Sequence, residues 1–302
     1  MKAAVCTKYG PPEVVRIEDR PNPSPKDDEI LIRVCATPIA SGDCRVRALK
    51  IPAAYKAIML LMYGFKRPRQ PIFGTELSGK VAAIGNNVTK FKVGDSVFAM
   101  TGMKMGAHAE FIVLPENANV VMKPTNINYE QAAAIAFGGT TALHYFSKVN
   151  LQKGQRILIY GASGAVGTSA VQLAKYFGAE VTGVCSGANI TLIKSLDADH
   201  VIDYTVEDFR SKSTRYDVIF DAVGKITKAS CKDVLATNGR YITVSAGMAK
   251  ERIEDMRLLG ELVQNGSLTP TIDRIYPLEQ IVAAYTYVDT GRKKGSVVLT
   301  MQ

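Results

Sequence analysis

The sequence has no tryptophan, only 3 histidines among 302 residues, and no apolar run as long as a membrane helix. Such a helix needs about 20 consecutive apolar residues. The most apolar run covers only residues 57–62, and Lys56 and Lys66 flank it. Residues 1–5 lead directly into an alternating strand pattern, which is unlike a signal peptide. We therefore expect a cytoplasmic protein that does not associate with membranes.

Cysteine is also scarce, and its spacing forms no motif. The 5 cysteines are odd in number and scattered, and no two are spaced as a Cys-x-x-Cys pair. This pattern argues against a disulfide framework and against a structural zinc site built from four cysteines. Buried free thiols are expected at Cys6, Cys35, Cys44, Cys185 and Cys231.

Acidic residues are outnumbered: 28 Asp and Glu stand against 37 Lys and Arg, which gives a formal net charge of +9. An excess of this sign is compatible with nucleic-acid binding. The basic residues are spread along the chain, however, and the densest cluster, residues 66–69, has no repeating aromatic partners. We therefore predict no nucleic-acid partner, and a positive surface potential that helps to attract a phosphorylated cofactor.

The first third of the chain has the pattern of β-structure. Residues 29–35, 80–84 and 96–99 are short, rich in β-branched or apolar side chains and bounded by turn residues, which indicates strands. The three prolines within residues 20–25 require an extended connector. Many short strands with few helices predict a barrel-like or sandwich-like first domain.

From residue 129 onward, strands and helices alternate. Strands are predicted at residues 156–160, 180–185, 200–203, 217–221 and 240–245, and helices at 165–177 and 190–196. This alternation predicts an α/β fold with a Rossmann-type doubly wound parallel sheet. A closing strand at residues 296–300 is expected to return to the first domain. The predicted domains are therefore 1–125 together with 270–302, and 126–269.

A glycine-rich turn joins the first of these strands to its helix. Gly161, Gly164 and Gly167 are spaced as Gly-x-x-Gly-x-x-Gly. The first allows a tight turn, the second lets a pyrophosphate approach the backbone, and the third lets helix and strand pack closely. The helix N-terminus then offers free N–H groups to the phosphates. The predicted contacts here are Gly161, Ser163, Gly164, Ala165, Val166 and Gly167.

The end of the second strand, residues 180–185, selects the cofactor. An NAD site usually has Asp or Glu at this point to bind the ribose 2′-hydroxyl. This chain has Ser186, and no carboxylate follows before Asp197. A carboxylate would repel a 2′-phosphate, whereas a small hydroxyl leaves room and donates a hydrogen bond. We therefore predict NADPH in preference to NADH; a loosely selective site is the alternative.

Several segments along nearly the whole chain carry a family resemblance. They are residues 9–14, 29–34, 74–81, 94–97, 106–111, 162–167 and 273–279. Together they resemble the medium-chain dehydrogenase/reductase superfamily and, within it, the zinc-independent quinone oxidoreductase branch. The resemblance implies a GroES-like β-barrel domain joined to a Rossmann domain.

The resemblance also implies further site residues. Its cofactor contacts correspond to Thr141, Val223 and Ala246, while Tyr204 matches a tyrosine that often contacts the 2′-phosphate. The branch frequently has a lysine where this chain has Asn189.

No zinc is expected. Zinc-bearing members of the superfamily have histidine where this chain has Thr75, and cysteine in the region of residues 41–43. None of His108, His144 and His200 stands at those positions. Because a catalytic zinc needs at least three donor side chains, we predict a metal-free site.

Catalytic residues are less clearly defined. Relatives often have Asn-x-x-Asp near the nicotinamide, and of this pair only the aspartate, Asp43, is present. Asp43 and Arg47 are the predicted catalytic residues, and a structural ion pair between them is the alternative. Without zinc, a quinone or α,β-unsaturated carbonyl is the favoured hydride acceptor, because its reduction gives a delocalised anion. A second function class, an NADPH-binding sensor or regulatory protein with little turnover, stays open.

The segment after Gly247 is short. Many relatives have a longer one, which holds an edge strand that pairs between subunits, whereas this chain passes almost directly to a helix predicted at residues 253–264. We therefore predict a monomer or a differently built homodimer.

Overall fold

A computed structural model describes residues 1–49, 60–61 and 63–301. The chain forms two compact units, Met1–Ala136 with Ile272–Gln302 (unit 1) and Phe137–Thr271 (unit 2). Residues 57–59 and 62 of the apolar run lie outside the described residues. Within the described ranges, no helix combines the length and the apolar character that a membrane span requires.

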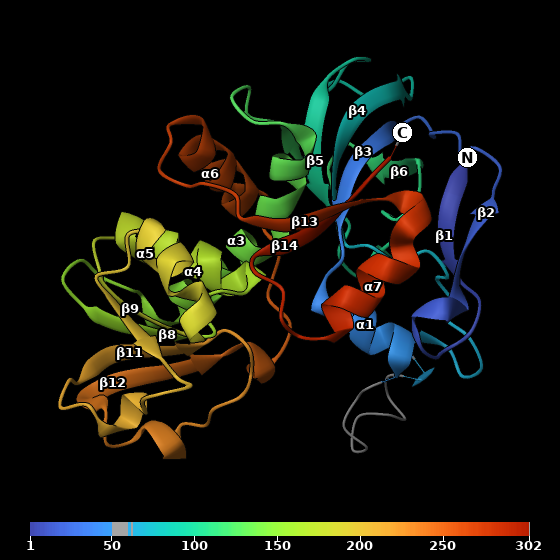
Figure 1. The fold of residues 1–302 in the computed structure, drawn as a ribbon. Helices are drawn as coiled ribbons and strands as arrows, with labels where there is room; N and C mark the ends of the chain where they lie inside the picture. Colours follow the sequence, from blue (N-terminus) through green and yellow to red (C-terminus); the bar gives the residue numbers. More distant parts are fainter. Residues whose placement is uncertain (50–59, 62, 302) are drawn as a thin grey trace. The chain divides into compact units, whose positions relative to one another are not determined.

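Unit 1 is built around the long strand β3 (Glu29–Pro38), which pairs with β4, β6 and β14 (Figure 1). Ile30, Ile32 and Val34 alternate along β3 and are all buried, as expected for the inward face of a strand. The other strands are β1 (Lys2–Cys6), β2 (Val15–Asp19), β4 (Glu76–Ile84), β5 (Ser96–Met100), β6 (Phe111–Pro115), β7 (Asn119–Met122), β13 (Ile272–Pro277) and β14 (Ser296–Thr300). Strand β14 lies between β3 and β13, so the closing segment completes the sheet of unit 1.

Two helices of unit 1 come from opposite parts of the sequence. Helix α1 (Ser41–Ala48) packs against α7 (Ile281–Asp289). Their buried side chains, including Val46 and Tyr285, share one apolar cluster with Phe73 of the loop that precedes β4. This cluster holds the two segments of unit 1 together.

Helix α3 (Tyr129–Val149) contributes to both units. Ala133 and Ala134 in its first turns pack against Ala36 of β3 and Val298 of β14. Unit 1 therefore extends to Ala136, past the predicted boundary at residue 125, because the start of the helix is part of its core.

Unit 2 holds a five-stranded parallel sheet in the order β10-β9-β8-β11-β12. Its strands are β8 (Arg156–Tyr160), β9 (Glu180–Cys185), β10 (His200–Asp203), β11 (Tyr216–Asp221) and β12 (Leu235–Thr243), and its remaining helices are α4 (Ala165–Tyr176), α5 (Ile190–Ser195) and α6 (Ile253–Gln264). Short 3-10 helices along the chain cover Pro12–Val14, Gly102–Lys104, Gly187–Asn189, Phe209–Ser211, Ala229–Cys231, Val244–Ala246 and Leu278–Gln280. The alternation read from the sequence is thus confirmed.

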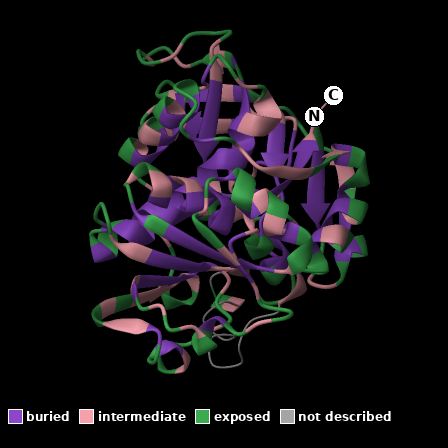
Figure 2. Ribbon diagram, turned by 60° about the vertical axis from the view of Figure 1, so that its left-hand side comes forward, coloured by how far each residue is buried: buried purple, intermediate pink, exposed green. Residues whose placement is uncertain are grey.

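Both faces of this sheet are covered, and Figure 2 shows its central strands as buried. Three consecutive residues of β8, Ile157, Leu158 and Ile159, are fully buried, the pattern of a strand packed on both faces. Leu158 shares an apolar cluster with Phe209 and Cys231 on one side. Helix α4 packs against β8 and β9.

Strand β12 ends the sheet within the part of the chain that the structure describes. Its pairing with β11 shifts register between the pairs Tyr216–Leu235 and Val218–Arg240. The predicted strand over residues 240–245 ends earlier, at Thr243, because the Thr243 side chain accepts a hydrogen bond from the Ser245 N–H and begins a short 3-10 helix. The chain then reaches α6 at Ile253 without a further strand.

Candidate cofactor site

The glycine-rich turn between β8 and α4 is held tightly against its neighbours. Gly161 has φ +79°, and the N–H groups of Gly161 and Ala162 both donate to the Val184 carbonyl oxygen at 3.0 Å. A Cβ on Gly161 would lie 2.5 Å from Val223 Cγ1, and one on Gly167 would lie 2.2 Å from the Gly161 carbonyl oxygen. These two positions therefore require glycine.

Gly164 differs from Gly161 and Gly167 because no neighbouring atom of the described residues crowds the position that a Cβ would occupy. It is the N-cap of α4, and the nearest atom to an added Cβ is 3.7 Å away. The N–H groups of the first helical turn, at Ala165, Val166 and Gly167, have no intrahelical acceptor and carry the positive end of the helix dipole. Backbone N–H groups beside an open surface form a binding site for a phosphate group.

Helix α3 lies directly beside this turn. A Cβ on Gly138 would come within 2.4 Å of the Ala165 carbonyl oxygen, so the backbones of α3 and α4 touch there. Thr141 follows one helical turn later and is 5 % exposed. A cofactor contact at Thr141 stays a prediction.

At the end of β9, three predicted residues form one hydrogen-bonded group. The Asn189 Nδ2 amide donates to Ser163 Oγ at 3.0 Å and to Ser186 Oγ at 3.2 Å. Asn189 is 8 % exposed, and its Oδ1 has no hydrogen-bond partner among the described residues. A buried acceptor of this kind normally has a partner, so the group is suited to a ligand that donates a hydrogen bond.

Asp203, which sequence reasoning missed, lies at the same edge of the sheet. Its carboxylate accepts hydrogen bonds from the Thr205 hydroxyl at 2.7 Å and from the Thr205 N–H at 2.9 Å. These bonds and one from Gly187 lower the pKa of Asp203. The end of β9 itself carries no acid, whereas Asp203 ends the neighbouring strand β10 and pairs in register with Cys185. The next residue, Tyr204, is 53 % exposed.

Asp221, at the end of β11, shapes the opposite side of the site. It is fully buried, and its carboxylate accepts from the N–H groups of Val223 at 3.2 Å, Gly224 at 2.8 Å and Ile226 at 3.1 Å. A Cβ on Gly224, which has φ +72°, would lie 2.1 Å from Ser245 Oγ. The loops after β11 and β12 therefore meet, and exposed Ala246 follows directly. Asp221 was not predicted as a site residue. Its position as an acid at the end of a buried strand, β11, is the sequence signal that could have identified it.

The predicted catalytic residues lie inside unit 1. Asp43 is 1 % exposed, and its carboxylate accepts from the N–H of Ala40 at 2.8 Å and of Gly74 at 3.4 Å. Burial raises the pKa of Asp43, while the charge of His108 and the two backbone hydrogen bonds lower it. These contacts fix the start of α1, and the catalytic role of Asp43 stays a prediction.

Arg47 pairs with a different acid from the one considered above. It is 0 % exposed, donates to the Gly10 carbonyl oxygen at 2.6 Å and forms an ion pair with Asp289 of α7. Its guanidinium also lies 5.0 Å from the centre of the Tyr285 ring. The alternative, a structural ion pair between Asp43 and Arg47, is therefore wrong, because Arg47 pairs with Asp289 and joins α1 to α7 instead. A catalytic role for Arg47 stays a prediction.

The three histidines lie in separate places. His108 is buried in unit 1, where its Nε2 lies 3.0 Å from the Pro38 carbonyl oxygen, and burial lowers its pKa. His144 is buried in α3, and His200 is exposed beside Glu180. No group of three or more His, Cys, Asp or Glu side chains within residues 1–49, 60–61 and 63–301 is placed to hold a metal ion. The cysteines are free thiols, four of them buried and Cys35 partly exposed.

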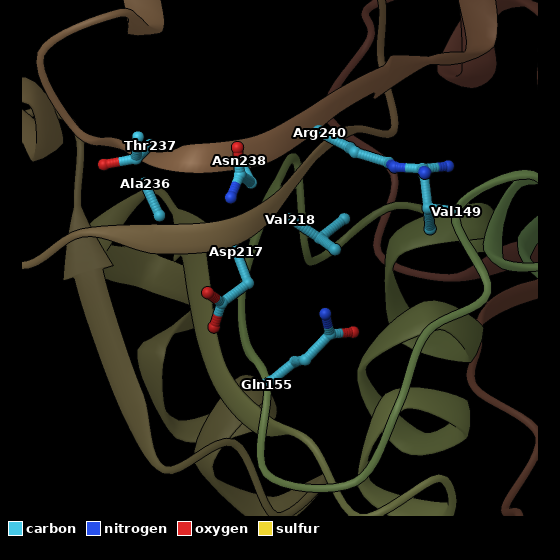
Figure 3. A pocket seen from close by; sticks show the side chains of 8 residues that line it. All are labelled: Val149, Gln155, Asp217, Val218, Ala236, Thr237, Asn238 and Arg240. Carbon is cyan, nitrogen blue, oxygen red and sulfur yellow. The ribbon is translucent and has the colours of Figure 1, made fainter.

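A pocket of about 380 Å³ opens elsewhere in unit 2 (Figure 3). Its lining residues are Val149, Gln155, Asp217, Val218, Ala236, Thr237, Asn238 and Arg240. Gln155 and Asp217 stand at the amino ends of β8 and β11, whereas ligands of open α/β sheets bind at the carboxyl ends. This pocket is therefore distinct from the cofactor site around Gly164.

Comparisons with known proteins agree with this geometry. A family model for the alcohol dehydrogenase GroES-like domain matches residues 26–125, and one for zinc-binding dehydrogenases matches residues 165–284. A 2-methylene-furan-3-one reductase from Solanum lycopersicum is 31 % identical, over 99 % of this chain and 79 % of the relative. An NADPH-dependent alkenal/one oxidoreductase from Arabidopsis thaliana is 29 % identical over the same shares.

A solved structure shows the same fold. The quinone oxidoreductase from Coxiella burnetii superposes with a TM-score of 0.85 at 27 % identity, covering 100 % of this chain and 99 % of that one. The predicted fold class, a Rossmann-type parallel sheet with a GroES-like domain, is therefore confirmed. The chain belongs to the medium-chain dehydrogenase/reductase superfamily, in its quinone oxidoreductase-like branch.

Proposed function

We propose that the protein is an NADPH-dependent oxidoreductase that transfers hydride to a quinone or an α,β-unsaturated carbonyl. The observation that carries this proposal is the open backbone at Gly164, on the amino end of α4, within a turn whose other glycines are sterically required. The names of the relatives, an alkenal/one oxidoreductase and a furanone reductase, support the acceptor class. They do not favour the sensor alternative.

The predicted site residues can be assigned to each part of a dinucleotide cofactor. The N–H groups of residues 165–167 would bind the pyrophosphate, while Ser163, Ser186, Asn189 and Tyr204 would surround the adenosine ribose. Thr141, Val223 and Ala246 would lie along the nicotinamide. The bound cofactor supplies the hydride, and the chain's task is to bind it, orient it and exclude water from the acceptor.

We also propose that no zinc takes part. Thr75 stands where zinc-bearing relatives have histidine, and residues 41–43, the region where those relatives have cysteine, contain none. An enone or quinone needs less electrophilic help than a ketone, because hydride addition places the charge on a conjugated system. This chemistry is consistent with a site that lacks a Lewis acid.

The preference for NADPH rests on the end of β9. Ser186 and the neutral amide of Asn189 carry no charge that would repel a 2′-phosphate. The carboxylate of Asp203 lies close by, and because hydrogen bonds with Thr205 and Gly187 lower its pKa, it stays charged and opposes a 2′-phosphate. We therefore expect NADPH to be preferred, by a smaller factor than in relatives that have a lysine at the position of Asn189.

A cofactor oxidation assay tests the function directly. The purified protein is mixed with NADPH or NADH and a panel of quinones and enones, and the loss of reduced nicotinamide absorbance is followed. We expect turnover with at least one acceptor, a higher kcat/KM for NADPH, and no loss of rate after treatment with a zinc chelator. A tenfold preference for NADH would contradict the cofactor assignment. Tight NADPH binding without turnover on any acceptor would favour the sensor alternative.

The short segment after β12 bears on assembly. Because the chain reaches α6 without a further edge strand, we propose a monomer or a homodimer built differently from that of longer relatives. Light scattering on the purified protein measures this, and we expect the mass of a single chain at low concentration. A tight dimer that persists on dilution would indicate that another surface replaces the missing strand.

The cellular location is proposed on chemical grounds. Five free thiols suit a reducing compartment, so a cytoplasmic location is the proposal. The partners proposed are small molecules, with no role for nucleic acid or membrane.

A further inference from the structure

A group of basic side chains lies where α3 meets the segment after Gly247. The Tyr145 hydroxyl donates to the Gly247 carbonyl oxygen at 2.9 Å, which fixes this segment against the helix. His144 and Lys148 are four residues apart on α3 and therefore share a face. Lys250 and Arg252 follow in the attached segment. We call His144, Lys148, Lys250 and Arg252 the basic cluster; all four belong to unit 2.

His144 is the buried member of the basic cluster. It is 8 % exposed, and its Nε2 has no hydrogen-bond partner among the described residues. Burial lowers the pKa of His144, and the positive charges of Lys148, Arg252 and Lys250 lower it further, while Asp255 acts in the opposite direction. A buried polar nitrogen without a partner is costly, and its position among cations indicates an anionic partner.

The charges of the basic cluster are only partly balanced. Arg252 forms a two-point ion pair with Asp255, at 2.9 and 3.0 Å. The Lys148 ammonium lies over the Tyr145 ring, 4.8 Å from its centre. Among the ion pairs of the described residues, none joins a carboxylate to Lys148 or Lys250. Glu251, between the two cations of the segment, makes an interaction of its own. Two ammonium groups therefore remain to bind an anion.

We infer that the basic cluster binds an oxyanion, a carboxylate or phosphate group carried by the hydride acceptor. Its place in unit 2 supports this use. Thr141 and Ala246 are both proposed to lie along the nicotinamide. His144 comes one helical turn after Thr141 on α3, and Gly247, which Tyr145 anchors, directly follows Ala246. The inference rests on the proposed function and narrows it: the substrate is an enone or quinone with a negatively charged substituent.

The site itself can be tested without any turnover. Because the chain has 3 histidines, the ring Cε1–H signal of each is resolved by NMR and assigned with single substitutions. Sulfate is the probe, since its charge is constant over the pH range used. We expect millimolar sulfate to move the His144 signal and to raise the pKa of His144, because a bound anion stabilises the imidazolium. His108, buried in unit 1, and exposed His200 should not respond.

Matched variants locate the response. In the double variant Lys148→Gln/Lys250→Gln, the change that sulfate causes in the His144 NMR signal should be at least fivefold smaller than in the wild type. Lys232→Gln removes one exposed ammonium of unit 2 outside the basic cluster and should respond as the wild type does. An unchanged shift in the double variant, or no shift of His144 in the wild type, would overturn the inference.

The assignment to the acceptor is tested with paired substrates. An enone carboxylic acid and its methyl ester share the same acceptor, and at the distal group only the acid carries a negative charge. We expect the wild type to have a KM about tenfold lower for the acid, and Lys250→Gln to raise the KM of the acid more than that of the ester. Equal KM values for acid and ester would reject the assignment, although turnover would still support the proposed function. If sulfate moves His144 while no acceptor is reduced, the anion site stands and the proposed function fails.

Discussion

Gly167→Ala is expected to destabilise unit 2 by about 3 kcal/mol, the cost of forcing an extra carbon into a packed interior. The new Cβ would lie 2.2 Å from the Gly161 carbonyl oxygen and 2.6 Å from the backbone of Ala162. Those neighbours cannot give way easily, because the N–H groups of Gly161 and Ala162 are both bound to the Val184 carbonyl oxygen. Urea unfolding followed by circular dichroism measures the loss.

Gly164→Ala is the matched variant, and its effect should be of another kind. The nearest atom to its Cβ is 3.7 Å away, so stability should change by less than about 1 kcal/mol. The methyl group would, however, occupy the space through which a pyrophosphate reaches the backbone of α4. We expect the Kd for NADPH, measured by nicotinamide fluorescence, to rise at least tenfold. If Gly164→Ala binds NADPH as the wild type does, the turn is not the cofactor site.

The second large effect is expected in unit 1, at the ion pair between α1 and α7. Asp289→Asn should destabilise the protein by about 3 kcal/mol, the low end of the cost of leaving a buried charge without its partner, because the Asp289 side chain is itself 24 % exposed. Arg47 is 0 % exposed, and its remaining contacts, the Gly10 carbonyl oxygen and the Tyr285 ring, carry no full negative charge. Thermal and urea unfolding both report the change.

Asp208→Asn provides the control for this prediction. Asp208 pairs with Arg210, but the two side chains are 46 % and 49 % exposed, and exposed pairs contribute about 1 kcal/mol or less. The double variant Arg47→Met/Asp289→Leu, which removes both charges, should recover most of the lost stability. If Asp289→Asn lowers the free energy of unfolding as little as Asp208→Asn does, then solvent or another anion stabilises the Arg47 charge. The ion pair with Asp289 would then not be what holds α1 to α7.

The sequence was sufficient for the parts of the fold that rest on local pattern. The strand over residues 156–160 and its glycine turn are short-range features, since hydrophobic run, glycine spacing and helix periodicity all lie within about 20 residues. The same holds for the end of β9 at Ser186. These features led correctly to the Rossmann-type sheet and, with the resemblance, to the superfamily.

The contacts that sequence reasoning missed join distant parts of the chain. Arg47 and Asp289 are 242 residues apart, so nothing near Arg47 in the sequence identifies its partner. Asp203 follows a different strand from Ser186, and only the pairing of β9 with β10 brings them to one edge. The hydrogen bond from Asn189 to Ser163, 26 residues away, likewise depends on tertiary placement. Spacing along the chain carries no such information.

The way unit 1 is assembled has a consequence for the order in which the protein folds during synthesis. Domains generally fold as they leave the ribosome, N-terminal first. Here β3 needs β14 as a neighbour, and buried Arg47 needs Asp289, and both partners lie in the segment Ile272–Gln302. All of unit 2 is translated before that segment. Unit 2 can therefore fold first. The N-terminal strands of unit 1 cannot complete their sheet until residues 272–302 have been synthesised, and until then they expose apolar surface that chaperones bind.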